Sequence, residues 1–130
     1  MGSIPFGILF ARAQNINLQE HGSRNIGATN VGRILGKKAG IFTLIGDTFK
    51  GWLAILLAYL VLIDTYAIAV AGITAFFGHL FSVFIKFKGG KGVAIGLGIH
   101  LYIMPTPTLM AIGVFALTLW IFNYVSLSSI

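Results

Sequence analysis

Two long apolar runs dominate the hydrophobic pattern of the chain. Residues 41–63 and 66–85 are almost entirely apolar, and only Asp64 and Thr65 separate them. A helix needs roughly 20 mostly apolar residues to cross a hydrocarbon core of about 30 Å. The pattern therefore predicts two transmembrane helices joined by a tight turn.

Three shorter apolar segments flank these runs. Residues 1–11 offer only about half the length that a membrane-crossing helix needs, so they are predicted to be the inner half of a first helix. Residues 92–104 and 108–122 are separated by the sequence PTP at 105–107. Because two prolines disfavour one continuous helix, we expect these segments to form a helical hairpin.

Eight of the nine basic residues fall in two polar stretches, residues 12–40 and 86–92, and the ninth, Lys50, lies in the half of the following span that is nearer to the first stretch. With the predicted spans, both stretches lie on the same side of the membrane, whereas the intervening turn carries Asp64 and no base. The positive-inside rule then places both stretches, and the terminal residues 123–130, in the cytoplasm. The predicted fold is an all-α, polytopic transmembrane helical bundle that forms a single membrane domain over residues 1–130.

Composition supports a membrane location and excludes several classes of site. The chain is 57% hydrophobic and only 9% charged, with a mean hydropathy of +0.93, whereas soluble domains are about one quarter charged. It has no cysteine, and its three histidines and three acidic residues are widely spaced, so we expect no metal site and no cofactor. The net charge of +6 comes from few basic residues without interleaved aromatic residues, which argues against nucleic-acid binding.

The second basic stretch contains the sequence FKGGKGVA, residues 87–94, which we call the glycine loop. No serine or threonine follows Lys91, so the nucleotide-binding P-loop pattern is not met. Consecutive glycines can form an anion-binding nest of backbone N–H groups, and a helix starting near Gly92 would point its N-terminus at the same place. A flexible cytoplasmic turn explains these residues equally well.

The first basic stretch combines short polar side chains with basic ones. Hydroxyls, amides and guanidinium groups are the usual donors to phosphate oxygens. Within residues 20–40 these groups belong to Ser23, Arg24, Asn25, Thr29, Asn30 and Arg33, followed by Lys37 and Lys38. The density of such donors favours an anion-binding role over that of a plain linker.

Three ionisable residues lie within the predicted spans. Asp47 and Lys50 are spaced i, i+3 on one helix and can form a salt bridge, which could be structural or could line a functional cavity. His79 precedes the glycine loop, and a lone histidine on an apolar face is more often a packing residue than a catalyst.

Several segments together resemble the PlsY-type acyl-phosphate:glycerol-3-phosphate acyltransferases of bacterial membranes. The resemblance is collinear and nearly end to end, and it rests on GSIPFG at 2–7, GSRNIGATNVGRILGKKAG at 22–40, DTFKG at 47–51, GHLFSVFIKFKGGKGVA at 78–94 and NYVSLSSI at 123–130. It implies an enzyme of the bacterial cell membrane with a cytoplasmic active site. Such an enzyme transfers a fatty acyl group from acyl phosphate to the 1-hydroxyl of glycerol 3-phosphate, giving lysophosphatidic acid for phospholipid biosynthesis.

The resemblance also implies roles for individual residues. Ser23 and Arg33 would hold glycerol 3-phosphate and, with Lys91, are the expected catalytic residues. The expected substrate-binding residues are Gly89, Gly90 and Gly92 of the phosphate loop, and Asn25, Thr29, Asn30, Lys50, His79 and Ser126. Family members have a longer first helix and continue past the segment that matches 123–130, so we expect this chain to be a fragment.

Two other functions remain open from the residues. Half-helices and glycine loops also build permeation sites, so a small anion channel or carrier subunit is one alternative. A non-catalytic scaffold whose basic loops contact anionic lipid headgroups is another. The interleaving of neutral donors with basic residues in both stretches favours the enzyme.

Overall fold

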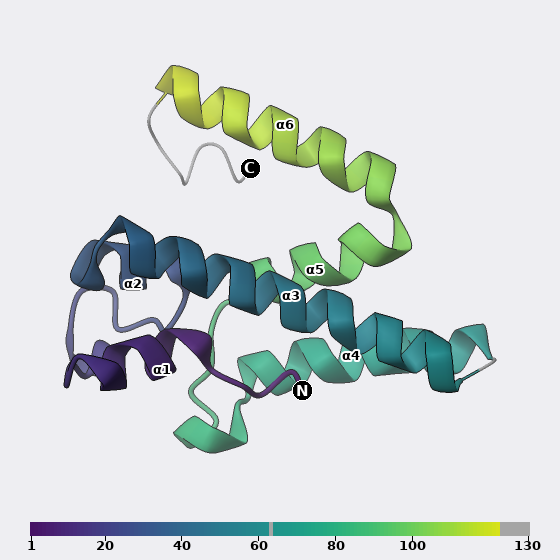
Figure 1. Ribbon diagram of the computed structural model, residues 1–130, viewed down its shortest axis with the longest axis horizontal. Coiled ribbons are helices and arrows are strands. Elements are labelled where there is room, and N and C mark those ends of the chain that lie inside the picture. Colours follow the sequence, from purple (N-terminus) through teal and green to yellow (C-terminus); the bar gives the residue numbers. More distant parts are fainter. Residues whose placement is uncertain (63, 123–130) are drawn as a thin grey trace.

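The described part of the chain, residues 1–62 and 64–122 of the computed structural model, consists of helices and connecting segments (Figure 1). In chain order the elements are α1 (Phe6–Ala13), the 3-10 helix η1 (Leu18–Glu20), α2 (Ala28–Leu35), α3 (Lys37–Val61), α4 (Thr65–Leu80), the 3-10 helix η2 (Val83–Ile85), α5 (Val93–Ile103) and α6 (Pro105–Phe122). The predicted all-α fold is confirmed.

The helices α3, α4, α5 and α6 alternate in direction, so the connection from α4 to α5 returns to the end of the molecule that holds α1 and α2 (Figure 1). Packing joins these regions. Ile85 of η2 belongs to the same buried cluster as Ile8 of α1, Leu18 of η1 and Ile26, which precedes α2. The two basic stretches are therefore held together by an apolar core.

The stretch predicted as a loop over residues 12–40 is largely helical. It contains α2, and α3 begins at Lys37, before the predicted span at residue 41. The density of glycine and polar residues suggested a loop, but α2 buries Val31 and packs Ile34 and Leu35 against the same cluster. This apolar face, which is only one helix turn long, stabilises a helix that composition alone concealed.

The segment at the N-terminus also differs from the prediction of a helix over residues 1–11. Helix α1 starts only at Phe6, and residues 2–4 pack instead against α3 and α4. The hydroxyl of Ser82 donates to the carbonyl oxygen of Ser3 at 2.6 Å, and the Lys50 ammonium donates to that of Ile4 at 2.6 Å. These bonds satisfy backbone groups that a helix would otherwise have paired.

The prolines do not form a separate turn between two helices. Pro105 and Pro107 lie in the first turn of α6, and the break between α5 and α6 is at Met104. Proline is tolerated in a first helical turn because the N–H that it lacks would have no partner within the helix.

Glycines allow the membrane helices to approach closely. Gly51 of α3 lies against Ile95 of α5, and Gly98 of α5 lies against the carbonyl group of Thr48. Small residues commonly permit such contacts between membrane helices, where dispersion forces rather than the hydrophobic effect drive association.

The outer surface of the bundle is apolar. Within the part of the chain that the structure describes, three helical segments are long and apolar enough to cross a membrane: Lys37–Val61, Thr65–Ile85 and Pro105–Phe122. Large apolar side chains such as Phe42, Leu60 and Trp120 are exposed on them. An exposed surface of this kind requires lipid as its solvent, so the chain is a multi-pass membrane protein.

Candidate active site

The first basic stretch is organised around the buried amide of Asn30. Its Oδ1 accepts a hydrogen bond from the backbone N–H of Ser23 at 3.0 Å, and its Nδ2 donates to the carbonyl oxygens of Asn25 at 2.8 Å and His21 at 3.2 Å. The Asn30 side chain is only 2% exposed. It therefore shapes residues 21–25 from within, which differs from the expectation that it contacts substrate.

The amide of Asn25 also has a partner inside this stretch, because its Oδ1 accepts from the N–H of Gly27 at 2.8 Å. In contrast, Ser23, Thr29 and Arg33 are all exposed. Ser23 precedes α2, Thr29 lies in its first turn and Arg33 in its last. These three side chains are therefore accessible to a ligand, as are the basic side chains of Arg24, Lys37 and Lys38 in the same stretch.

The glycine loop docks onto the C-terminal end of α4. The N–H groups of Gly89 and Gly90 donate to the carbonyl oxygens of Leu80, at 2.9 Å, and His79, at 3.3 Å. A methyl group at Gly89 would overlap both of these carbonyl oxygens. The glycines are thus required for docking, and their two N–H groups are not free to form the anion nest that the sequence suggested.

The remaining donors of the glycine loop lie at the start of α5. Lys91 is exposed, and Gly92 caps the helix with φ of +81°, a backbone conformation that favours glycine. Helix α5 starts at Val93, within one residue of the expected position. Its free N–H groups and partial positive charge lie next to Lys91, so this is where the loop could attract an anion.

Beneath the glycine loop lies a buried cluster of Asp47, Lys50 and His79. Lys50 Nζ lies 2.6 Å from Asp47 Oδ1 and 2.9 Å from His79 Nδ1. The three residues are 2% to 3% exposed. The spacing of Asp47 and Lys50 predicted their contact, but nothing in the sequence indicated the bond from Lys50 to Ile4. Lys50, expected to bind substrate, is instead occupied by these internal partners.

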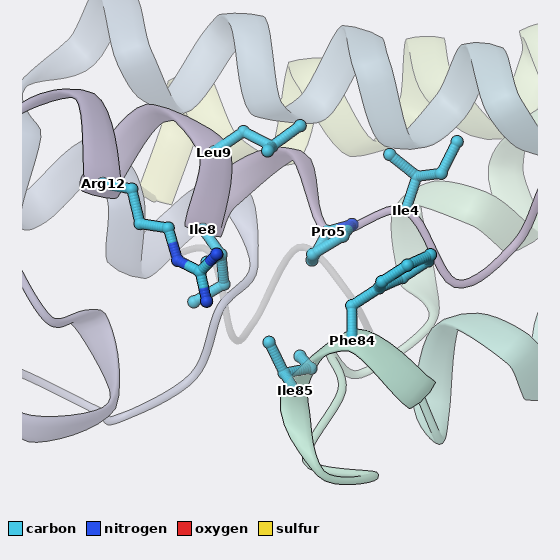
Figure 2. A pocket seen from close by; sticks show the side chains of 7 residues that line it. All are labelled: Ile4, Pro5, Ile8, Leu9, Arg12, Phe84 and Ile85. Carbon is cyan, nitrogen blue, oxygen red and sulfur yellow. The ribbon is translucent and has the colours of Figure 1, made fainter.

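One groove lies beside α1 and is lined mainly by apolar side chains. Its volume is about 190 Å³, and its lining residues are Ile4, Pro5, Ile8, Leu9, Arg12, Phe84 and Ile85. Figure 2 shows Arg12 and Ile8 extending from α1 towards Ile85, with Phe84 facing Ile4 and Pro5. None of these residues was predicted to belong to the site.

Ser126 lies outside the described residues, together with the rest of segment 123–130. Within the described residues no group of three His, Cys, Asp or Glu side chains could hold a metal ion. Of the site residues predicted from the sequence, the exposed ones are Ser23, Thr29, Arg33 and Lys91. The cluster of Asp47, Lys50 and His79 is buried.

Comparison with known proteins identifies a family that the sequence of this chain matches. All residues, 1–130, match the model of a family described as glycerol-3-phosphate acyltransferase. Two relatives bearing that name are 48% identical over 100% of the chain, from Geotalea daltonii, and 44% identical over 99% of the chain, from Bacillus subtilis. The chain covers 67% of each of these relatives.

Solved structures agree with the sequence matches. A crystal structure of PlsY, an integral membrane glycerol 3-phosphate acyltransferase in its glycerol 3-phosphate form, superposes with a TM-score of 0.89 and is 39% identical. The lysophosphatidic acid form of PlsY gives a TM-score of 0.84. Both alignments cover 98% of this chain and 64% of the solved one, so the chain spans about two thirds of the length of these relatives.

The match over the whole chain, the identity to named relatives and the shared fold lead to one conclusion: the chain belongs to the glycerol-3-phosphate acyltransferase family.

Proposed function

We propose that this protein transfers a fatty acyl group from acyl phosphate to the 1-hydroxyl of glycerol 3-phosphate, in the cell membrane of a bacterium. The products are lysophosphatidic acid and inorganic phosphate. The observation that supports this most strongly is the likeness to PlsY in its glycerol 3-phosphate form, with 39% identity and a TM-score of 0.89 over 98% of the chain.

The chemistry of the reaction suits the groups that the chain provides. The hydroxyl oxygen attacks the acyl carbonyl carbon, the bond from that carbon to the phosphate oxygen breaks, and the hydroxyl proton leaves with the phosphate. Because phosphate is already a good leaving group, the step needs no nucleophile from the protein. Positioning of two anions and stabilisation of developing negative charge are sufficient.

Both substrates are anionic, so they repel one another unless positive groups surround them. The accessible Arg33 and Lys91 belong to two segments that one apolar cluster ties together. In the proposed site Arg33 and Ser23 hold the phosphate of glycerol 3-phosphate, while Lys91 and the start of α5 hold the phosphoryl group of the donor. The acyl chain remains among the apolar helices.

The proposed site faces the cytoplasm. Glycerol 3-phosphate is a soluble, charged metabolite, and eight of the nine basic residues lie in segments at the end of the bundle that carries α1, α2 and the glycine loop. The exception, Lys50, is buried within α3. This distribution supports a cytoplasmic location for that end.

An acyl-transfer assay tests the proposal directly. The protein in detergent micelles or nanodiscs is supplied with labelled glycerol 3-phosphate and one of three donors: a long-chain acyl phosphate, an acyl thioester, or a free fatty acid. We expect labelled lysophosphatidic acid with acyl phosphate alone, and its formation to fall at least about 10²-fold in Arg33→Ala or Lys91→Ala. Product from the thioester but not from acyl phosphate would contradict the proposed donor.

A further inference from the structure

A second groove adjoins the groove beside α1. Its volume is about 410 Å³, and it shares Ile8, Arg12 and Ile85 with the first groove. We call the first the apolar groove and the second the polar groove. The other residues that line the polar groove belong to η1 and to the segment before it: Asn15, Ile16, Asn17, Leu18 and Gln19. The two grooves together form an apolar surface that leads to amide groups, with Arg12 where they meet.

The apolar groove is oriented as a lipid of the adjacent membrane leaflet would be. At one end lies Ile4, whose carbonyl oxygen accepts a hydrogen bond from Lys50 within the membrane-crossing α3 (Figure 2). At the other end Arg12 lies in the last turn of α1, which runs from the middle of the bundle towards its basic end (Figure 1). The apolar side chains are therefore at the depth of acyl chains, and Arg12 is near the level of the headgroups.

The side chains of the apolar groove differ in exposure. Ile8 and Ile85 are buried members of the cluster that joins the two basic stretches. Leu9 and Phe84 are 50% and 68% exposed. Exposed apolar side chains at this depth face lipid, so an acyl chain is the occupant that the membrane itself supplies. A chain in this groove would pack directly against the cluster.

The charge at the meeting point of the two grooves favours an anionic headgroup. Arg12 is exposed and forms no ion pair with any acidic residue in 1–62 or 64–122. The lining residues given by the structure for both grooves include no Asp or Glu. Glu20 is close in sequence, but it accepts a hydrogen bond from Asn17 Nδ2 at 2.6 Å. A guanidinium group binds phosphate through two parallel hydrogen bonds, and basic residues at a membrane surface attract anionic lipids.

We propose that the two grooves bind one anionic phospholipid of the surrounding membrane. One acyl chain lies in the apolar groove, the phosphate contacts Arg12, and the amides of Asn15 and Gln19 contact the headgroup. By packing against Ile8 and Ile85, the lipid stabilises the junction of α1 with η2. The occupant is a component of the bilayer rather than a substrate, so the inference does not depend on the proposed reaction.

Two substitutions separate recognition of the phosphate from recognition of the acyl chain. Arg12→Gln removes the positive charge and the guanidinium group, and Leu9→Trp narrows the apolar groove with a larger side chain. Lys38→Gln and Leu44→Trp are the matched controls, because they change an exposed lysine and an exposed leucine of α3 that line neither groove.

The experiment titrates delipidated protein in detergent with phosphatidylglycerol, or with the diacylglycerol that has the same chains, and counts bound lipids by native mass spectrometry. We expect one phosphatidylglycerol to bind about tenfold or more tightly than the diacylglycerol, and Arg12→Gln to remove most of this difference. Leu9→Trp should weaken binding of both lipids about tenfold or more, with both controls within about threefold of the parent. Thermal unfolding checks that each variant is folded.

Other outcomes overturn the inference. Equal affinity of the parent for the two lipids would mean that no phosphate is recognised, and an equal loss in Lys38→Gln would mean that the basic end attracts lipid without a defined site. Displacement of phosphatidylglycerol by a long-chain acyl phosphate would assign the grooves to a substrate. Absence of a tightly bound lipid would mean that another segment of the chain or a second copy covers the grooves; the mass of the protein distinguishes these two.

Discussion

At the scale of single residues, the buried Lys50 is the clearest case of a charge whose environment determines its role. Its ammonium joins α3, the N-terminal segment and the end of α4 through Asp47, Ile4 and His79. Burying two charges has a large desolvation cost, which their mutual attraction must offset.

Removing one partner of this pair should destabilise the protein strongly. We expect Lys50→Met to lower the free energy of unfolding by about 3–5 kcal/mol, because Asp47 is left buried and unpaired. Thermal unfolding in detergent should show a fall in Tm on the order of 10 °C or more. Lys38→Met, which removes an exposed lysine of the same helix, is the control and should change Tm little.

The double substitution Lys50→Met with Asp47→Leu distinguishes charge from packing. Since no buried charge is left unpaired, we expect it to recover part of the stability lost in Lys50→Met. If Lys50→Met alone is as stable as Lys38→Met, the buried pair does not hold α3, the N-terminal segment and the end of α4 together.

Residue spacing predicted some of these contacts and could not predict others. The i, i+3 spacing of Asp47 and Lys50 gave their ion pair, since such neighbours share a helix face. The role of Asn30 was not predictable, because its partners Ser23, Asn25 and His21 are bound through backbone atoms, which every residue has. The anion nest predicted at Gly89 and Gly90 is absent for a similar reason, because backbone carbonyl oxygens of α4 accept hydrogen bonds from both N–H groups.

At the scale of elements, the apolar runs at 41–63 and 66–85 overlap most of α3 and α4, although α3 begins earlier, at Lys37, and α4 ends earlier, at Leu80. Their length indicates α3 and α4 directly, and Asp64 begins α4 by accepting a hydrogen bond from the N–H of Tyr66 at 3.3 Å. Helix α2 was missed because it is only 8 residues long and rich in glycine and polar residues. The sequence predicts a turn at Pro105 and Pro107 because prolines are found both at the start of a helix and at a break between two helices.

The contact between α3 and α5 depends on the absence of a side chain at Gly98. A methyl group there would overlap the carbonyl oxygen of Thr48, which backbone geometry holds in place. We expect Gly98→Ala to lower the free energy of unfolding by about 1–3 kcal/mol through overpacking. The measurement is chemical or thermal unfolding of the protein in a fixed detergent.

Gly113→Ala provides the matched control for this substitution. Gly113 lies within α6, and no atom of residues 1–62 or 64–122 lies within 4 Å of the position of an added methyl group. Alanine should therefore be neutral or slightly stabilising there because of its higher helix propensity. Equal stability of the two variants would refute a close contact of α3 and α5 at Gly98.

At the scale of the whole molecule, the arrangement of charges and helices gives the protein two different faces. An apolar surface surrounds α3, α4 and α6, while the basic segments gather where α4 ends and α1 and α2 lie (Figure 1). The sequence predicted this polarity from the distribution of lysine and arginine. It did not predict the apolar cluster of Ile8, Leu18, Ile26 and Ile85 that joins the two segments.

The account depends on Arg33 and Lys91 lying at the same membrane face, and cysteine accessibility measures this directly. The chain contains no cysteine, so Arg33→Cys, Lys91→Cys and Asp64→Cys can each be made in an unmodified background. Each variant is treated in intact cells and in inverted membrane vesicles with a maleimide that does not cross membranes. We predict labelling of residues 33 and 91 in inverted vesicles only, and of residue 64 in intact cells; labelling of 33 and 91 from opposite sides would contradict a shared site.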